Sequence, residues 1–202
     1  MTEYHHLPDW TFPSIFRCSE GHARTYEAMT QRLPNHKDDP SIPFGCGAHS
    51  LRAFDKVMKL VRPYSVLEIG FNVGVSAQFW LYAGVQRLVS MDIRDDRHVR
   101  AGEKVVSEAF PGLFQLIIGD SDSAPERDYD LMFVDGGHNY ADVMNDIANG
   151  RRLGIRNFFF DDIFEKWGPG VVPAILDSGL IVEAVMGNMA LCVDEPSWKT
   201  LQ

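Results

Sequence analysis

The chain has 202 residues, of which 45% are hydrophobic and 23% charged, a composition typical of a single globular domain. Its formal net charge of −9 argues against a nucleic-acid substrate, because affinity for DNA or RNA comes largely from Lys and Arg. No apolar stretch is long enough to span a membrane, and the N-terminus lacks the basic-then-apolar order of a signal peptide, so we expect a cytoplasmic protein.

The first 47 residues are rich in Pro, His and polar side chains, and we expect them to form a cap with one short helix at residues 21–33. Residues 48–202 are then expected to form one domain. Cys46 and His49 have the C-x-x-H spacing of a half zinc site, but no second pair follows at a suitable distance, so we expect no structural zinc.

A helix is predicted over residues 48–62, just before the first strand. Leu51, Phe54 and Met58 recur there at helical spacing, and Pro63 ends the pattern. The helix therefore delivers the chain to the start of the sheet.

Beyond Pro63, strand-like and helix-like segments alternate, which is typical of a parallel sheet with crossover helices. The predicted strands are residues 65–69, 87–91, 114–118, 131–134, 157–160, 179–185 and 189–193. The predicted helices between them are residues 75–83, 97–110, 140–153 and 171–177. Only three residues separate the last two strands, which fits a hairpin, so the final strand is expected to run antiparallel. The fold class is α/β, a Rossmann-like, seven-stranded, mostly parallel sheet with helices on both faces.

Residues 66–76 read as an apolar strand, a glycine-containing turn and the start of a helix. Gly70 and Gly74 remove side chains where a ligand must approach the backbone, and Asn72 tolerates a left-handed turn. Glu68 places an acid near the end of the strand. The alternative is a tight strand-to-helix turn that binds no ligand.

This turn resembles the first motif of the class I S-adenosylmethionine (SAM)-dependent methyltransferases, in which spaced glycines follow an acidic residue. The middle glycine that is frequent in that family is Asn72 here. The resemblance implies SAM as cofactor. It also implies a cofactor site that includes Glu68, Gly70, Phe71, Asn72, Gly74, Ser76, Asp92, Ile93, Asp120, Ser121 and Asp135.

Two of these acids end the next two predicted strands. Asp92 lies 22 positions after Gly70, close to the spacing at which an acid reaches ribose hydroxyls. Asp120, with Ser121 beside it, follows the third strand, and the resemblance implies a contact with the adenine amino group. Polar groups at the carboxyl ends of neighbouring parallel strands share the crevice in which open α/β sheets bind ligands.

Further acids follow the fourth and fifth strands. Asp135 ends one of them, with His138 just before the next helix, and Asp161 and Asp162 end the other. Converging carboxylates repel one another unless a cation is bound, and their oxygen atoms suit Mg²⁺ or Ca²⁺. The alternative is that His138 caps the helix and that the acidic pair only terminates a strand.

The acidic pair resembles the Mg²⁺ site of catechol O-methyltransferase, and the Asp-Gly-Gly-His-x-Tyr segment at residues 135–140 is similar to macrocin-type and mycinamicin-type sugar O-methyltransferases. The resemblance implies a divalent metal, expected to be Mg²⁺, with Asp135, Asp161 and Asp162 as ligands and His138 as the catalytic base. A metal lowers the pKa of an acceptor hydroxyl, and a histidine accepts its proton. Trp167, in the loop that follows, either walls the acceptor pocket or packs in the interior.

We therefore expect a metal-assisted O-methyltransferase acting on a small hydroxylated molecule, of the sugar or natural-product type. The short N-terminal region leaves the acceptor pocket either open or completed by a partner subunit in a homodimer. One alternative is a SAM-binding protein of this fold without activity. Another is a nicotinamide-dependent oxidoreductase, which Glu68, the lack of a full G-x-G-x-x-G motif and the terminal hairpin argue against.

Overall fold

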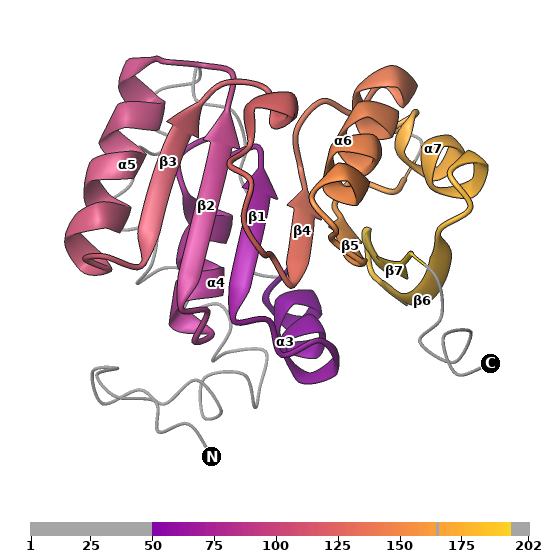
Figure 1. Cartoon of the computed structure of the whole chain (residues 1–202), viewed down its shortest axis with the longest axis horizontal. Coiled ribbons are helices and arrows are strands. Elements are labelled where there is room, and N and C mark those ends of the chain that lie inside the picture. The colour runs from indigo at the N-terminus through magenta and orange to yellow at the C-terminus, as the bar shows by residue number, and fades with distance from the viewer. Residues whose placement is uncertain (1–49, 165, 195–202) are drawn as a thin grey trace.

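The structure is a computed structural model of the whole chain, and it describes residues 50–164 and 166–194 (Figure 1). Its strands are β1 (Ser65–Ile69), β2 (Arg87–Asp92), β3 (Phe114–Ile118), β4 (Leu131–Val134), β5 (Asn157–Phe160), β6 (Ile181–Met186) and β7 (Met189–Val193). Its helices are α3 (Leu51–Leu60), α4 (Val75–Tyr82), α5 (Arg97–Ala109), the short 3₁₀ helix η2 (Ser121–Ser123), α6 (Tyr140–Arg152) and α7 (Val171–Asp177). No helix in these ranges is both long and apolar enough to cross a membrane.

All seven strands form one sheet in the order β3-β2-β1-β4-β5-β7-β6. The first five strands pair in parallel. Strand β7 runs antiparallel to both of its neighbours, β5 and β6, as the short connection before it predicted. The predicted fold class, with its antiparallel C-terminal strand, is confirmed.

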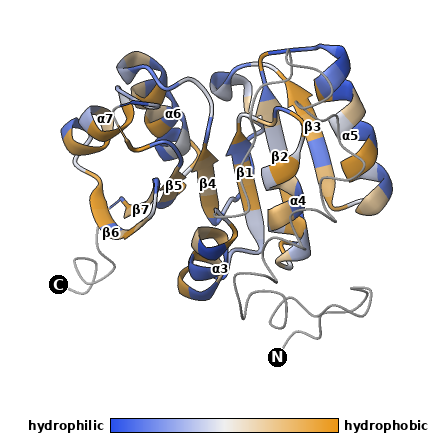
Figure 2. Ribbon diagram, turned by 180° about the vertical axis from the view of Figure 1, so that it is seen from behind, coloured by the Kyte–Doolittle hydropathy of each residue, from blue (hydrophilic) through white to orange (hydrophobic). Residues whose placement is uncertain are grey.

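Two hydrophobic cores lie on opposite faces of the sheet because successive side chains of a strand point to opposite sides. One core joins the sheet to α3, α4 and α5, and the other joins it to α6 and α7. Val66 of β1 belongs to the first core, whereas Leu67 and Ile69 belong to the second. Figure 2 shows hydrophobic residues along the strands and mixed faces on helices such as α3 and α5. The parallel strands are covered on both sides, which explains their continuous apolar runs.

Several predicted boundaries differ from the structure by one residue, and two differ by two residues beside a left-handed residue. Helix α3 ends at Leu60 rather than at residue 62, since Arg62 adopts a φ of 54° and the residue before a proline disfavours helix. Strand β6 begins at Ile181 rather than at residue 179, because Gly179 has a φ of 75° and ends the turn after α7. The predicted N-terminal cap and its helix lie outside the described residues.

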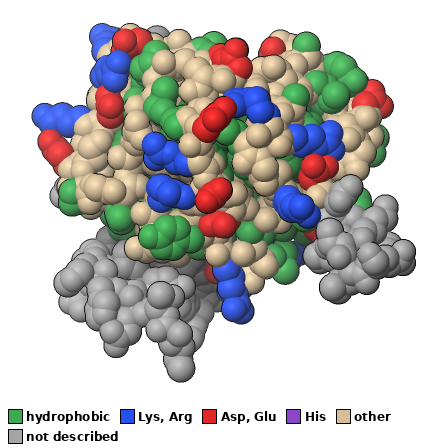
Figure 3. All heavy atoms as spheres, viewed as in Figure 1, with side chains coloured by type: hydrophobic (Ala, Val, Ile, Leu, Met, Phe, Trp, Pro, Cys, Tyr) green, Lys and Arg blue, Asp and Glu red, His purple; other side chains and the backbone are tan. Residues whose placement is uncertain are grey.

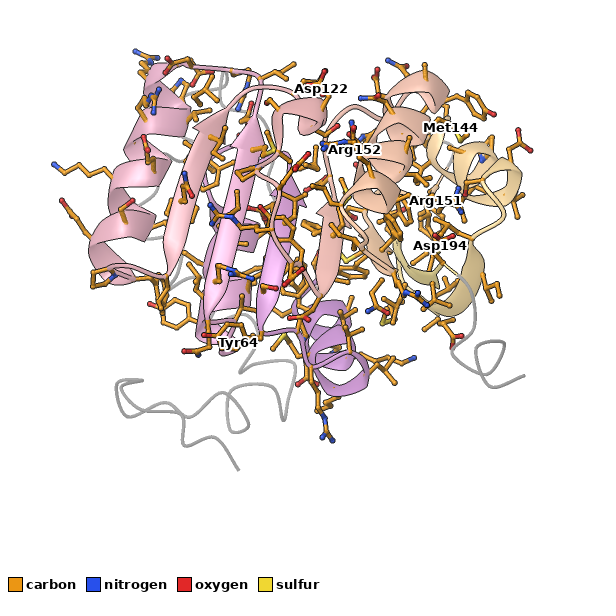
Figure 4. The ribbon with its side chains drawn as sticks, viewed as in Figure 1. Tyr64, Asp122, Met144, Arg151, Arg152 and Asp194 are labelled. Carbon is orange, nitrogen blue, oxygen red and sulfur yellow. The ribbon has the colours of Figure 1, made fainter. Side chains whose placement is uncertain are left out.

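The last two residues of α6 form hydrogen bonds with neighbouring segments of the chain (Figure 4). Arg151 donates to Asp194, just beyond β7, at 2.5 Å and to the carbonyl of Ser178 at 2.9 Å. Arg152 donates to the carbonyl of Asp122 in η2 at 3.2 Å. On the face shown in Figure 3, charges of both signs are interspersed.

Candidate active site

The polar residues predicted from the sequence gather at one edge of the sheet, because β1 to β5 are parallel and end together. The register pairs Ile69 with both Met91 and Val134, and Val134 with Phe160. The backbone N–H of Asp135 continues this ladder by donating to Ile69 at 2.9 Å, and that of Asp161 does so by donating to Val134 at 3.1 Å. Hydrogen bonds of the sheet therefore fix the backbone positions of the first residues after β4 and β5.

The turn after β1 lies directly against the segment after β4. Gly70 has a φ of 95°, and a Cβ atom built there would lie 2.0 Å from the carbonyl oxygen of Asp135. Glycine is therefore required at this position on two grounds, backbone conformation and close approach. Asn72 also adopts the left-handed region, with a φ of 52°, as its residue type predicted. The turn places the candidate cofactor site next to Asp135.

Glu68 is completely buried beneath this turn rather than lying open at the edge of the sheet. Burial raises the pKa of its carboxyl to about 8, although hydrogen bonds with Ser76 and Ser90 act in the opposite direction. Among the described residues its Oε1 atom has no hydrogen-bond partner. The raised pKa favours the protonated carboxyl at neutral pH, so Glu68 contributes a buried polar group rather than an open negative charge.

Asp92 organises the loop that follows β2. Its Oδ2 accepts the backbone N–H of Asn72 at 2.7 Å, and its Oδ1 accepts that of Arg94 at 2.9 Å. The guanidinium of Arg94 lies 3.5 Å from the same carboxylate and donates to the Asn72 side chain at 3.1 Å. Ile93, between them, is 76% exposed. Sequence reasoning missed Arg94, for which the neighbouring acids were the available signal.

Asp120 caps η2 by accepting the backbone N–H of Ser121 at 2.6 Å. The hydroxyl of Ser121 is buried and accepts a hydrogen bond from Asn149 of α6 at 3.0 Å. Asp146, one helical turn before Asn149, is also buried and hydrogen-bonds with Ser121. This polar group on α6 was not predicted, because its partner lies 25 positions earlier in the chain.

Burial raises the pKa of Asp146 to about 7, and the charges of Asp120 and Asp142 act in the same direction. Between pH 4 and 7 the unfolded chain therefore loses this proton while the folded protein keeps it, so the wild type loses stability as the pH rises. We expect Asp146→Asn to match the wild type near pH 4 and to exceed it by about 4 kcal/mol at pH 8. Urea unfolding at both pH values measures this difference. Glu108→Gln, an exposed change on α5 that does not act on Asp146, is the control; equal differences for Asp146→Asn at both pH values would contradict the prediction.

Asp135, His138 and Asp162 form a cluster at the ends of β4 and β5. One candidate ligand atom from each lies within 4.8 Å of the others. His138 stands between the two acids, with Nε2 3.6 Å from Asp135 and Nδ1 3.6 Å from Asp162. All three side chains are partly exposed, by 21% to 31%. The donor set of two carboxylates and one imidazole fits a divalent cation.

The pairing with the Asp135 carboxylate is the largest influence on His138, and it raises the pKa of the imidazole. The charges of Asp162 and Asp161 act in the same direction, whereas burial opposes them. His138 does not cap α6, because the N-cap of that helix is Asn139. Among the residues described, its buried Nε2 atom has no hydrogen-bond partner. The imidazole therefore faces the two carboxylates, with Nε2 3.6 Å from Asp135 and Nδ1 3.6 Å from Asp162.

Asp161 is not one of the three residues whose ligand atoms converge, although its charge also acts on His138. Its carboxylate accepts the backbone N–H of Asp162 at 2.7 Å. Asp162 has a φ of 53°, which turns the chain sharply after β5. The structure thus brings His138, rather than Asp161, together with Asp135 and Asp162.

The loop after Asp162 presents two aromatic side chains and supports His138. Phe164 is 55% exposed and Trp167 is 58% exposed, so Trp167 is not a buried packing residue. The ammonium of Lys166 lies 4.5 Å from the centre of the Trp167 ring. Gly170 donates its backbone N–H to the carbonyl of His138 at 3.0 Å. This loop therefore borders the cluster and fixes the position of the histidine.

The family model for a methyltransferase domain matches residues 67–154, from β1 to just beyond α6. The structure resembles that of the SAH-bound methyltransferase PaMTH1 of Podospora anserina, with a TM-score of 0.65, 13% identity and coverage of 95% of this chain and 99% of that one. It resembles the SAM complex of TomG, an O-methyltransferase of tomaymycin synthesis from Streptomyces achromogenes, with a TM-score of 0.63, 16% identity and coverage of 84% and 90%.

A third similar structure is CalS11, a TDP-rhamnose 3'-O-methyltransferase of calicheamicin biosynthesis, with a TM-score of 0.58, 18% identity and coverage of 93% and 100%. No curated protein matches the chain by sequence. The solved structures, at these identities, establish the fold, and the family match places a methyltransferase domain within it. The chain thus has the fold of these methyltransferase structures, and its residues 67–154 match the model of a methyltransferase domain.

Proposed function

We propose that the protein transfers the methyl group of SAM to a hydroxyl of a small acceptor, with help from a divalent cation such as Mg²⁺. The observation that carries the proposal is the cluster of Asp135, His138 and Asp162 beside the glycine turn of β1. Asp135 links the two regions, because its backbone contacts Gly70 while its carboxylate faces His138.

In this proposal Asp135 and Asp162 hold the cation, with Asp161 supporting the turn from which Asp162 projects. A bound divalent cation supplies a lower pKa for the acceptor hydroxyl and a fixed orientation. Because the carboxylates that raise the pKa of His138 are the ones that would hold the cation, a bound cation would offset their charge and lower that pKa, which favours the neutral imidazole.

The chemistry requires one proton transfer and one displacement. His138 takes the proton of the acceptor hydroxyl as general base. The acceptor oxygen then attacks the methyl carbon, so that a C–O bond forms while the C–S bond of the sulfonium breaks and SAH leaves. The residues around the β1 turn hold the donor so that the methyl group faces this oxygen.

The acceptor class is proposed from the loop that borders the cluster. Phe164 and Trp167 offer exposed aromatic surface in the loop that follows Asp162, which suits an acceptor with an apolar or planar body and a hydroxyl at its edge. TomG and CalS11, both O-methyltransferases by name, support oxygen as the accepting atom. A sugar or natural-product scaffold fits these features.

Calorimetric titration of the wild type with SAH, and then with Mg²⁺, tests the proposal first. We expect both to bind, after which release of SAH is measured with catechols and TDP-rhamnose as probe acceptors. Binding of SAH without Mg²⁺ and without turnover would favour a SAM-binding protein that lacks activity. Failure to bind SAH would contradict the proposed cofactor.

A further inference from the structure

The turn between β6 and β7 lies against the acidic turn that follows β5, and one residue makes most of the contact. The carbonyl of Asn188 accepts the backbone N–H of Ile163 at 3.0 Å. The side-chain oxygen of Asn188 accepts the backbone N–H of Phe164 at 2.9 Å, and its amide donates to Oδ1 of Asp162 at 2.5 Å. Three consecutive residues after the strand are thus bound by a single asparagine.

Two features of Asp162 would destabilise its position without such support. Its backbone is in the left-handed region, and its carboxylate lies near another carboxylate. Its φ of 53° is uncommon for a residue other than glycine. Its carbonyl oxygen also lies where a Cβ on Gly168 would approach to 2.0 Å, so the loop closes tightly over it. Its carboxylate stands near that of Asp135, with His138 between them. Like charges at this distance favour a side chain that swings away.

The two oxygens of Asp162 have different neighbours. Oδ1 is held by the amide of Asn188, while Oδ2 faces Nδ1 of His138 at 3.6 Å. A hydrogen bond to one oxygen fixes the rotation of the carboxylate and leaves the other directed at the cluster. Partners of this kind orient carboxylate ligands in metal sites.

We propose that Asn188 is a positioning residue that holds Asp162 in the geometry required to bind the cation. The inference rests on the proposed function, and it assigns part of the site to the terminal hairpin, outside the residues that match the methyltransferase-domain family. Asn188 itself touches neither substrate nor cofactor in this scheme. Its effect passes through Asp162.

The test measures Mn²⁺ affinity of the full chain by electron paramagnetic resonance, together with SAH affinity by calorimetry. Asn188→Ala keeps the carbonyl that binds Ile163 and removes both side-chain hydrogen bonds. We expect Mn²⁺ affinity to fall about 10- to 100-fold, as for other partners of metal ligands, with SAH affinity unchanged. The matched control is Asn157→Ala, which removes a 2.9 Å hydrogen bond to the carbonyl of Asp130 at the opposite end of β5 and leaves Mn²⁺ affinity unchanged.

A second variant guards against misfolding of the first. Asn188→Ser keeps a polar residue at the turn but lacks the amide that donates to Asp162, so it is expected to lose the same affinity. If a variant that still binds SAH has the Mn²⁺ affinity of the wild type, the proposed role of Asn188 is wrong, while the proposed cation site stands. Absence of Mn²⁺ binding in the wild type would overturn the proposed cation site and this role with it.

Discussion

Replacing Asp135 and Asp162 together by asparagine is expected to weaken Mn²⁺ or Mg²⁺ binding more than 100-fold. Removal of a partner of a metal ligand costs about 10- to 100-fold, and this double variant removes the charge of two ligands. Asparagine tolerates the left-handed backbone of residue 162, so the turn after β5 is preserved. Methyl transfer at a fixed cation concentration should fall by a similar factor.

Thermal unfolding gives a second readout of the same prediction. A cation that binds only the folded protein raises its stability, so Mg²⁺ should raise the Tm of the wild type and leave that of the double variant unchanged.

The control for this double variant is Glu108→Gln/Glu126→Gln, which removes two negative charges from side chains that are 68% and 86% exposed. It should keep the wild-type response to Mg²⁺. A Tm shift by Mg²⁺ that survives in the aspartate variant would show that the cation binds elsewhere on this acidic protein, and the proposed site would be wrong.

Most of the fold could be predicted from local sequence. Buried parallel strands need apolar residues on both faces, and runs such as residues 131–134 and 157–160 end where the structure ends them. The short connection at residues 187–188 forces a hairpin, which fixed the direction of β7. The errors at Arg62 and Gly179 concern single left-handed residues, whose effect on a boundary depends on the local turn.

For the site, the sequence predicted only which residues lie at the ends of neighbouring strands. Asp135 and the acidic pair had to meet at one edge, because the strands before them are parallel neighbours. The acid of the pair that faces His138 depends on the backbone conformation of Asp162. Its positive φ is set by tertiary contacts, which the sequence does not reveal. Asn188 and Asp146 act through partners about 25 positions away, so no local motif indicates them.

His138→Gln is expected to lower kcat by about 10²- to 10⁴-fold, the usual contribution of a general base, while SAH affinity stays unchanged. Glutamine can still form hydrogen bonds beside Asp135 and Asp162, but its amide does not accept a proton at neutral pH. The backbone of residue 138 keeps its bond from Gly170, so the segment before α6 should remain in place.

The dependence of the rate on cation concentration separates the two roles that the geometry allows His138. If the imidazole is the base, the loss persists at saturating Mn²⁺ and the Mn²⁺ affinity remains close to that of the wild type. If it is a ligand, as its place in the cluster permits, Mn²⁺ affinity falls and a high Mn²⁺ concentration restores the rate. Initial rates of SAH release over a range of Mn²⁺ concentrations, measured with an acceptor that the wild type methylates, distinguish these results. The Asp135→Asn/Asp162→Asn variant provides the reference for loss of metal ligands. If high Mn²⁺ concentration restores the rate of His138→Gln as it does the rate of that reference variant, the assignment of His138 as base is wrong.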